Sequence, residues 1–141
     1  MSADFLDSNV LVYLFDERDA LKRERAEALV RQGLDRRSAH ISFQVVQETL
    51  NVLTRKLTPP VPPAQAQSLL GALLMPLCRV WPSEALYRKA LGLQARWQFS
   101  FYDALIVAAA LEAGCTRLFT EDLQDGQQVE TLRIENPFRG P

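Results

Sequence analysis

Histidine and cysteine, the side chains on which most zinc sites and many nucleophilic enzymes depend, are scarce in this sequence. Among 141 residues there are one histidine, His40, and two cysteines, Cys78 and Cys115. The cysteines form no CxxC pair, so a zinc site is not expected, and both are predicted to be buried free thiols. A Ser-His-Asp grouping, a P-loop and a dinucleotide-binding glycine motif are also absent, which removes the enzyme classes built on them.

Long apolar runs and a strong charge of either sign are lacking as well. The longest stretch without a charged residue, 57–78, contains five prolines and cannot form a membrane-spanning helix. The first residues show neither the basic nor the apolar segment of a signal peptide, so we expect a cytoplasmic protein without a membrane contact. The net charge of −1 gives no overall attraction to a polyanion, and nucleic-acid binding therefore needs a local patch.

The sequence does contain an alternation of short apolar segments and amphipathic segments. Strands are expected over residues 3–6, 40–43, 78–81, 117–120 and 132–135, and helices over residues 19–34, 44–57, 64–74, 83–97 and 101–113. Strands that alternate with helices are typical of a layered α/β domain with a mostly parallel central sheet. The length favours a single domain over residues 1–141.

Four acidic residues stand at the ends of the expected strands or in the first turns of the expected helices. Asp7 ends the first strand, Glu48 lies one turn into the helix after the second strand, and Asp122 follows the fourth strand. Asp103 opens the apolar helix that precedes the fourth strand. In a parallel sheet with right-handed connections these positions share one edge, where the ligands of open α/β sheets bind.

Each acid also has an ordinary structural interpretation, which the residues alone leave open. Asp7 can cap the following helix, and Asp103 can complement a helix dipole. Glu48 can be a solvated helix residue, and Asp122 can be a turn residue before Gly126. Four carboxylates at one edge, however, repel each other unless a cation lies between them. An oxygen-only ligand set favours Mg²⁺ or Mn²⁺, either of which can activate water for attack on a phosphodiester.

Four segments of the chain resemble the PIN-domain family, and within it the toxin ribonucleases of VapBC-type toxin–antitoxin pairs. They are residues 5–13, 41–48, 100–106 and 120–126, which carry the four acids in order at spacings of 41, 55 and 19 residues. The resemblance implies a three-layer α/β/α sandwich with a central, mostly parallel five-stranded sheet. It further implies a Mg²⁺- or Mn²⁺-dependent endoribonuclease whose catalytic and metal-binding residues are Asp7, Glu48, Asp103 and Asp122.

The family resemblance also implies supporting residues and partners. Ser8, Asn9 and Thr120 match polar residues that support the site in this family, and Asp125 matches an additional acid found in many members. The expected partners are RNA as substrate, a second copy in a homodimer, and an antitoxin whose C-terminal segment covers the site. Five cations are available for phosphate contacts, unless they only form a solvated helix face: Lys22, Arg23, Arg25, Arg36 and Arg37.

Two other classes of function are alternatives. The first is a non-catalytic PIN-fold module that binds RNA or a protein, against which the complete set of acids argues, because like charges are costly to keep together. The second is a phosphate-handling α/β domain, such as a response-regulator receiver or a haloacid-dehalogenase-like phosphatase. The receiver needs adjacent acids after the first strand and a late lysine, and the phosphatase needs an acid where this chain has Asn9.

Overall fold

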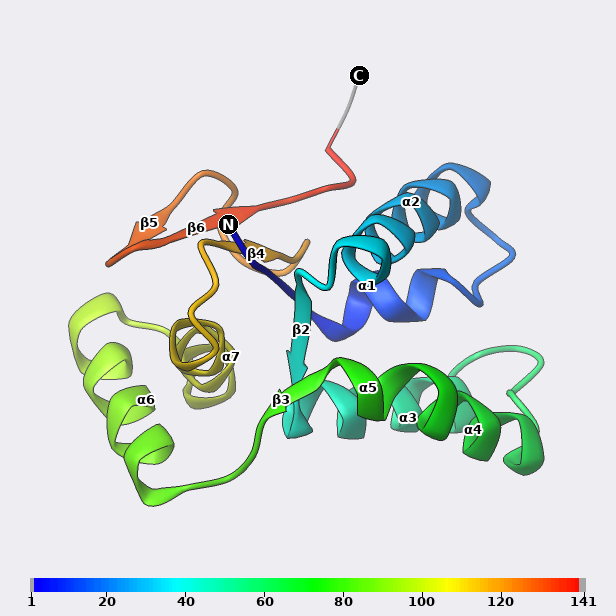
Figure 1. Cartoon of the computed structure of the whole chain (residues 1–141), viewed down its shortest axis with the longest axis horizontal. Helices are drawn as coiled ribbons and strands as arrows, with labels where there is room; N and C mark the ends of the chain where they lie inside the picture. Colours follow the sequence, from blue (N-terminus) through cyan, green and yellow to red (C-terminus); the bar gives the residue numbers. More distant parts are fainter. Residues whose placement is uncertain (1, 140–141) are drawn as a thin grey trace.

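A six-stranded sheet lies at the centre of the computed structural model, which describes residues 2–139 (Figure 1). The ends of the predicted domain, Met1, Gly140 and Pro141, lie outside the described residues. In chain order the strands are β1 (Asp4–Leu6), β2 (Ala39–Ser42), β3 (Cys78–Val80), β4 (Arg117–Phe119), β5 (Gln128–Val129) and β6 (Leu132–Glu135). Across the sheet their order is β3-β2-β1-β4-β6-β5. The β1–β2, β2–β3, β1–β4 and β4–β6 pairs are parallel, which confirms the predicted α/β fold with a mostly parallel sheet.

The five predicted strands all form, each within one residue of its expected ends, but the predicted count of five is wrong because β5 adds a sixth. β5 has two residues and runs antiparallel to β6. The chain reverses at Glu130, whose φ of 53° lies in the left-handed region that tight hairpin turns require. A two-residue strand is too short to show an apolar–polar alternation, and no glycine or asparagine marks this turn, so the hairpin leaves no sequence signal.

The helices follow the predicted order, with short additions at two places. They are α1 (Ser8–Tyr13), α2 (Ala20–Arg36), α3 (Phe43–Arg55), α4 (Pro63–Leu69), a π-helical segment η1 (Leu70–Leu74), α5 (Met75–Leu77), α6 (Glu84–Trp97) and α7 (Phe101–Glu112). The additions are α1 and α5, which span fewer than two turns and therefore show no helical periodicity. Within the described part of the chain, no helix is both long enough and apolar enough to cross a membrane.

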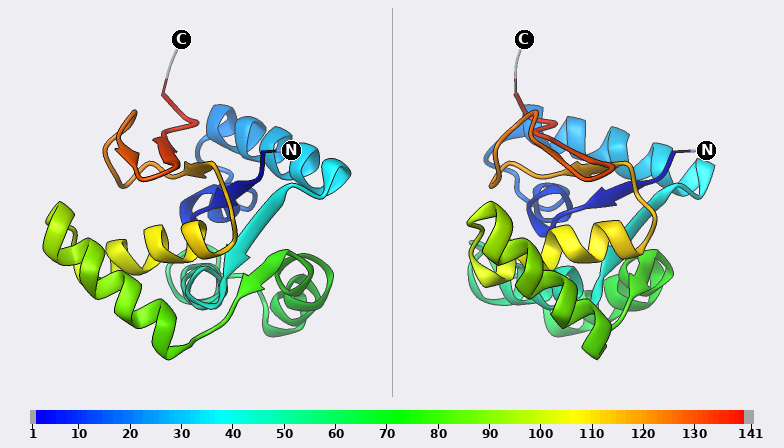
Figure 2. Two further views of the ribbon diagram at one scale, coloured as in Figure 1. Left: turned by 60° about the vertical axis from the view of Figure 1, so that its left-hand side comes forward. Right: turned by 90° about the vertical axis from the view of Figure 1, so that its left-hand side faces the viewer.

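The sheet lies between two helical layers. Helix α2 covers one face, and α7 with α6 covers the other, as the view from the side shows (Figure 2). The strands fill the space between the layers with side chains that have no solvent exposure, among them Phe5, Leu118 and Ile134. Full burial of each such side chain stabilises the fold by about 1.5–3 kcal/mol.

Helix α7 is a deeply buried helix, as the sequence predicts. Its residues 104–110 are all buried, as the continuous apolar run indicates. The helix begins at Ser100, whose Oγ accepts a hydrogen bond from the amide of Asp103 at 3.2 Å. It ends before Gly114, whose φ of 74° is the left-handed conformation expected of a glycine that terminates a helix. Asp103 is thus held at the open end of a buried helix.

Both cysteines are free and buried, as predicted. Burial raises the pKa of the Cys115 thiol to about 12. Burial also raises the pKa of the Cys78 thiol above its ordinary value. Both thiols are therefore poor nucleophiles at neutral pH.

The sheet order determines where a ligand can bind. From β1 the chain builds β2 and then β3 on one side, and later adds β4 on the other side of β1. This reversal places a topological switch point beside the carboxyl end of β1. The segments that leave β1, β2 and β4 all begin at this edge.

Candidate functional site

Asp7, directly after β1, is a buried acid that caps the next helix. Its Oδ1 accepts a hydrogen bond from the amide of Ser8 at 2.7 Å, and its Oδ2 accepts one from the Thr120 hydroxyl at 2.7 Å. Desolvation, with smaller contributions from the negative charges of Glu48 and Asp122, raises its pKa to about 6 despite these two hydrogen bonds. The capping interpretation of Asp7 is therefore correct, and among the described residues the charges that act on this carboxylate are those of Glu48 and Asp122.

Glu48, on α3, reaches the same region. Its Oε1 accepts a hydrogen bond from the Ser8 hydroxyl at 3.3 Å, and its Oε2 accepts one from the amide of Gln44 at 3.4 Å. The same amide nitrogen of Gln44 donates to the backbone carbonyl of Tyr102 at 3.2 Å. Gln44 thereby connects Glu48 on α3 to the first turn of α7, where Asp103 lies.

Asp122 is held by the turn that follows β4. The amide of Asp122 donates to Thr120 Oγ1 at 3.1 Å, and Asn9 Nδ2 donates to Asp122 Oδ2 at 3.1 Å. Asn9 Nδ2 also donates to Thr120 Oγ1 at 3.2 Å. Each of the three polar residues predicted to support the site is thus bonded to one of its acids: Ser8 to Glu48, Asn9 to Asp122 and Thr120 to Asp7.

The four predicted acids line one pocket. They come from four separate places in the chain, after β1, on α3, at the start of α7 and after β4, and they share the pocket with Ser8, Gln44, Asn51, Val52, Lys56, Tyr102 and Ile106. We call this the acidic pocket. Carboxylate oxygens are the ligands that Mg²⁺ and Mn²⁺ prefer, so the donor set suits such an ion.

Two further observations bear on how well an ion fits. Gln44 Oε1 and Asn9 Oδ1 are buried oxygens without a hydrogen-bond partner among the described residues, and such oxygens normally accept from a water or a ligand. Within residues 2–139, however, no three acidic, histidine or cysteine side chains lie close enough to form a metal-binding group. The donor chemistry thus fits a divalent cation. To bind one between them, the carboxylates would have to move closer together.

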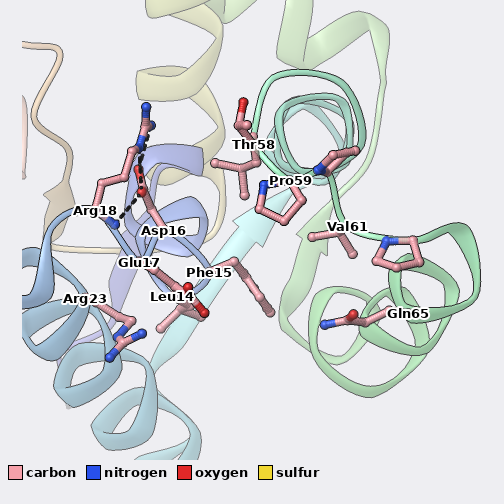
Figure 3. A pocket seen from close by; sticks show the side chains of 13 residues that line it. Leu14, Phe15, Asp16, Glu17, Arg18, Arg23, Thr58, Pro59, Val61 and Gln65 are labelled. Atoms are coloured by element: carbon pink, nitrogen blue, oxygen red, sulfur yellow. Dashed lines mark hydrogen bonds and ion pairs between the residues drawn. The ribbon is translucent and has the colours of Figure 1, made fainter.

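A second pocket lies beside the acidic one, between the α1–α2 loop and the proline-rich connector from α3 to α4 (Figure 3). Pro59 and Val61 form one wall, and the ion pair of Asp16 with Arg18 lies on the opposite wall. Hydrogen bonds from Arg18 hold the pKa of Asp16 below its usual value. Asp16 is therefore already neutralised by a cation, unlike the acids of the acidic pocket.

The comparison with protein-family models gives one match that covers most of the chain. The PIN-domain model matches residues 5–125. The chain belongs to the PIN-domain family. A comparison with curated proteins gives no significant match.

Solved structures with the same fold agree with this PIN-domain assignment. A toxin–antitoxin complex from Klebsiella pneumoniae is 22% identical with a TM-score of 0.66, and the match covers 96% of this chain and 98% of that chain. VapC20 from Mycobacterium tuberculosis, a sarcin–ricin loop cleaving toxin, is 21% identical with a TM-score of 0.61 over 85% of this chain and 92% of that chain. DNA-bound VapBC from Salmonella typhimurium is 19% identical with a TM-score of 0.64 over 97% and 99%. At these identities the likeness establishes the fold.

Not every residue singled out in the sequence reaches the acidic pocket of this PIN domain. Asp125 accepts a hydrogen bond from the amide of Asn136 at 2.8 Å and pairs with Arg139 at 3.4 Å, so it ties its loop to the C-terminal segment. None of the five predicted phosphate-binding cations lines the acidic pocket. Lys22 pairs with Glu121. The others on α2 and at its end are Arg23, Arg25, Arg36 and Arg37.

Other residues of the acidic pocket escape the sequence analysis. Gln44 and Asn51 lie four residues before and three residues after Glu48 on α3, and this spacing places them on one helix face. Lys56 follows α3 and lines the same pocket. The helical spacing around Glu48 was the available signal for the two amides, whereas nothing local distinguishes Lys56 from other exposed lysines.

Proposed function

We propose that this PIN domain is a metal-dependent endoribonuclease that hydrolyses RNA phosphodiester bonds in the acidic pocket. The observation that carries the proposal is the convergence of Asp7, Glu48, Asp103 and Asp122 on one pocket at the switch point of the sheet. The raised pKa of Asp7 supports it, because a buried carboxylate beside two further acids favours a bound cation. Mg²⁺ or Mn²⁺ is the ion that this oxygen-only set suits.

The residues of the pocket divide the work of hydrolysis. Asp7 and Asp103 would hold the ion, and the ion supplies water activation and stabilisation of charge on the phosphate. Glu48 and Asp122 complete the ligand set or orient the attacking water through their carboxylates. Lys56, which lines the same pocket, would donate a hydrogen bond to a phosphate oxygen and offset its charge.

We further propose that the protein acts as the toxin of a toxin–antitoxin pair. The support is the fold shared with a toxin–antitoxin complex, with a toxin described as cleaving the sarcin–ricin loop, and with VapBC bound to DNA. The proposed partners are an RNA substrate, a cognate antitoxin that covers the acidic pocket, and a second copy of the chain. A cytoplasmic location belongs to the same proposal.

Cleavage of a structured RNA tests the proposed activity. The wild-type protein is expected to cut the RNA with Mg²⁺ or Mn²⁺ and to stop when EDTA is added. Asp103→Asn should lower the rate by about 100-fold or more, because it removes a carboxylate that would hold the ion. Asp35→Asn, the same chemical change on α2 away from the pocket, is the control and should leave the rate unchanged. Cleavage that survives both EDTA and D103N would contradict the proposal.

Direct measurement of metal binding separates this activity from a non-catalytic module. The observation that favours the module is the lack of a closed group of three metal-binding side chains among the described residues. Calorimetric titration with Mn²⁺ should give one saturable binding event in the wild type and none in D7N. RNA binding without any Mn²⁺ binding would instead support the non-catalytic module.

A further inference from the structure

Glu121 lies between Thr120 and Asp122 but does not line the acidic pocket. Its carboxylate instead contacts two helices, α1 and α2. Oε1 accepts a hydrogen bond from the Tyr13 hydroxyl at 2.5 Å, and Oε2 pairs with Lys22 Nζ at 2.9 Å. Tyr13 comes from α1 and Lys22 from α2, so one side chain joins the turn after β4 to two helices that precede it by about a hundred residues.

Lys22 is held more firmly than an ordinary surface lysine. Its Nζ also donates to the Tyr13 hydroxyl at 3.1 Å, and it lies 4.8 Å from the centre of the Tyr13 ring and 5.8 Å from that of Phe138. The rings of Tyr13 and Phe138 meet edge to face at 4.9 Å. The Lys22 side chain is 33% exposed and that of Glu121 is 22% exposed, so solvent screens the pair only in part.

The titration behaviour of the cluster agrees with this geometry. Hydrogen bonds to Tyr13 and Glu121 raise the pKa of Lys22 above its ordinary value. Burial and the hydrogen bond to Glu121 raise the pKa of Tyr13. At neutral pH the lysine is charged and the phenol keeps the proton that it donates.

The turn that carries Asp122 is therefore held by side-chain contacts at two of its residues, Thr120 and Glu121. On the pocket side, Thr120 Oγ1 accepts from the amide of Asp122 and donates to Asp7. At the next residue, Glu121 is fixed by its contacts with Tyr13 and Lys22. No regular helix or strand covers residues 120–122, so these side-chain contacts act together with the hydrogen bond from Asn9 Nδ2 to Asp122 Oδ2 in setting the direction of the Asp122 carboxylate.

We infer that Tyr13 and Lys22 are positioning residues, which orient Asp122 toward the acidic pocket by fixing Glu121. The inference rests on the proposed metal-dependent activity for its catalytic consequence, but the restraint on the turn itself does not. Removal of the contacts that orient a metal ligand commonly changes metal affinity or activity by about 10–100-fold.

A purely electrostatic role of Lys22 predicts the opposite effect of its removal on cation binding. Lys22 is a positive charge paired with Glu121, the residue next to the proposed metal ligand Asp122. If it acted only through its charge, its removal would make the pocket more negative and would tighten cation binding. If it acts by positioning Asp122, its removal weakens cation binding.

The test compares Lys22→Met and Tyr13→Phe with the matched control Lys89→Met. Lys89 forms a similar ion pair with Glu130 at 2.7 Å, far from the acidic pocket. The first readout is the Mn²⁺ dissociation constant by calorimetry, and the second is hydrogen exchange of the Asp122 amide in metal-free protein, followed by NMR. Tyr13→Phe keeps the ring contact with Phe138 and removes only the hydroxyl, so it guards against loss of folding in K22M.

We expect K22M and Y13F to raise the Mn²⁺ dissociation constant roughly tenfold and to speed exchange of the Asp122 amide roughly fivefold. K89M should match the wild type in both readouts, and Lys22→Arg should restore most of the Mn²⁺ affinity. Unchanged Asp122 exchange in both variants, or tighter Mn²⁺ binding by K22M, overturns the inference. If the wild type binds no Mn²⁺, the proposed function fails, and the exchange data still decide whether Tyr13 and Lys22 hold the turn.

Discussion

Asp7 and Asp16 are both acids with little exposure to solvent, at 7% and 8%, yet their pKa values shift in opposite directions. Arg18 donates two side-chain hydrogen bonds to Asp16 at 3.0 Å and lowers its pKa. Among the described residues no cation contributes to the pKa of Asp7, and desolvation raises it. Burial without a paired cation therefore leaves Asp7 suited to bind a metal ion, whereas the ion pair with Arg18 already neutralises Asp16.

The raised pKa of Asp7 predicts that the stability of the folded protein depends on pH, and that Asp7→Asn removes this dependence. In metal-free protein the pKa is about 6, compared with 3.8 for an ordinary aspartate, so the folded state holds this proton more tightly than the unfolded chain does. The resulting stabilisation is complete below about pH 3.8 and is lost as the pH rises through about 6. The shift corresponds to about 3 kcal/mol. The free energy of unfolding of D7N should therefore rise relative to that of the wild type by up to that amount between about pH 4 and 7.

Denaturant unfolding in EDTA at several pH values measures this difference. The wild type alone should lose stability through the interval around pH 6, whereas the losses from other acids are common to both proteins. Stability curves of wild type and D7N that stay parallel across this interval would refute the assigned pKa. Added Mn²⁺ should abolish the wild-type loss, because the ion replaces the proton.

At the scale of elements, helix α2 approaches strand β2 closely at Gly33. A Cβ added to Gly33 of α2 would lie 2.3 Å from the Cβ of Ala39 in β2, and Ala39 has no flexible side chain that can move away. The glycine is therefore needed for spacing, although its backbone is ordinary helix. The sequence places this glycine near the end of a helix and does not reveal the contact.

Gly33→Ala is accordingly expected to push α2 from the sheet and to destabilise the protein by about 1–3 kcal/mol, as overpacked cores do. Gly92→Ala in α6 is the matched control, because nothing lies within 4 Å of an added Cβ there. That variant should stabilise the protein by roughly 0.5–1 kcal/mol, since alanine is the better helix former. Chemical denaturation of both variants measures the two effects, and a G33A protein as stable as the wild type would disprove the close contact.

For the whole molecule, metal binding at the switch point should stabilise the fold as a unit. An ion that binds the folded state alone adds about 2.7 kcal/mol at a concentration of one hundred dissociation constants. For a domain of this size the melting temperature should then rise by roughly 10 °C. The rise should appear with Mn²⁺, vanish with EDTA, and be absent in D7N.

Differential scanning calorimetry provides the measurement, with Asp35→Asn as the control that keeps the wild-type response. Asp35 is an exposed acid on α2, so any shift that D35N shares with the wild type does not come from it. An equal rise in D7N and wild type would show that the ion acts outside the acidic pocket.

Local patterns in the sequence determine most of the elements of this protein. The apolar run 104–110 determines a buried helix, and Ser83 and Ser100 accept hydrogen bonds from the amides three residues later, as helix caps do. Such features depend on neighbours along the chain, so composition and spacing suffice to predict them. The predicted strand ends, in turn, mark Asp7 and Glu48 as candidate site residues.

The tertiary structure alone decides which side chains meet. Asp7 and Thr120 are hydrogen-bonded although 113 positions separate them in sequence, and Tyr13 and Glu121 although 108 do. Whether an acid faces the pocket or a nearby arginine depends on how β1, β4 and the C-terminal segment pack, and no local pattern encodes that. The sequence therefore determined the elements and the candidate acids, while packing across the sheet decided that Asp122 faces the pocket, and that Glu121 and Asp125 serve to hold the turns beside it.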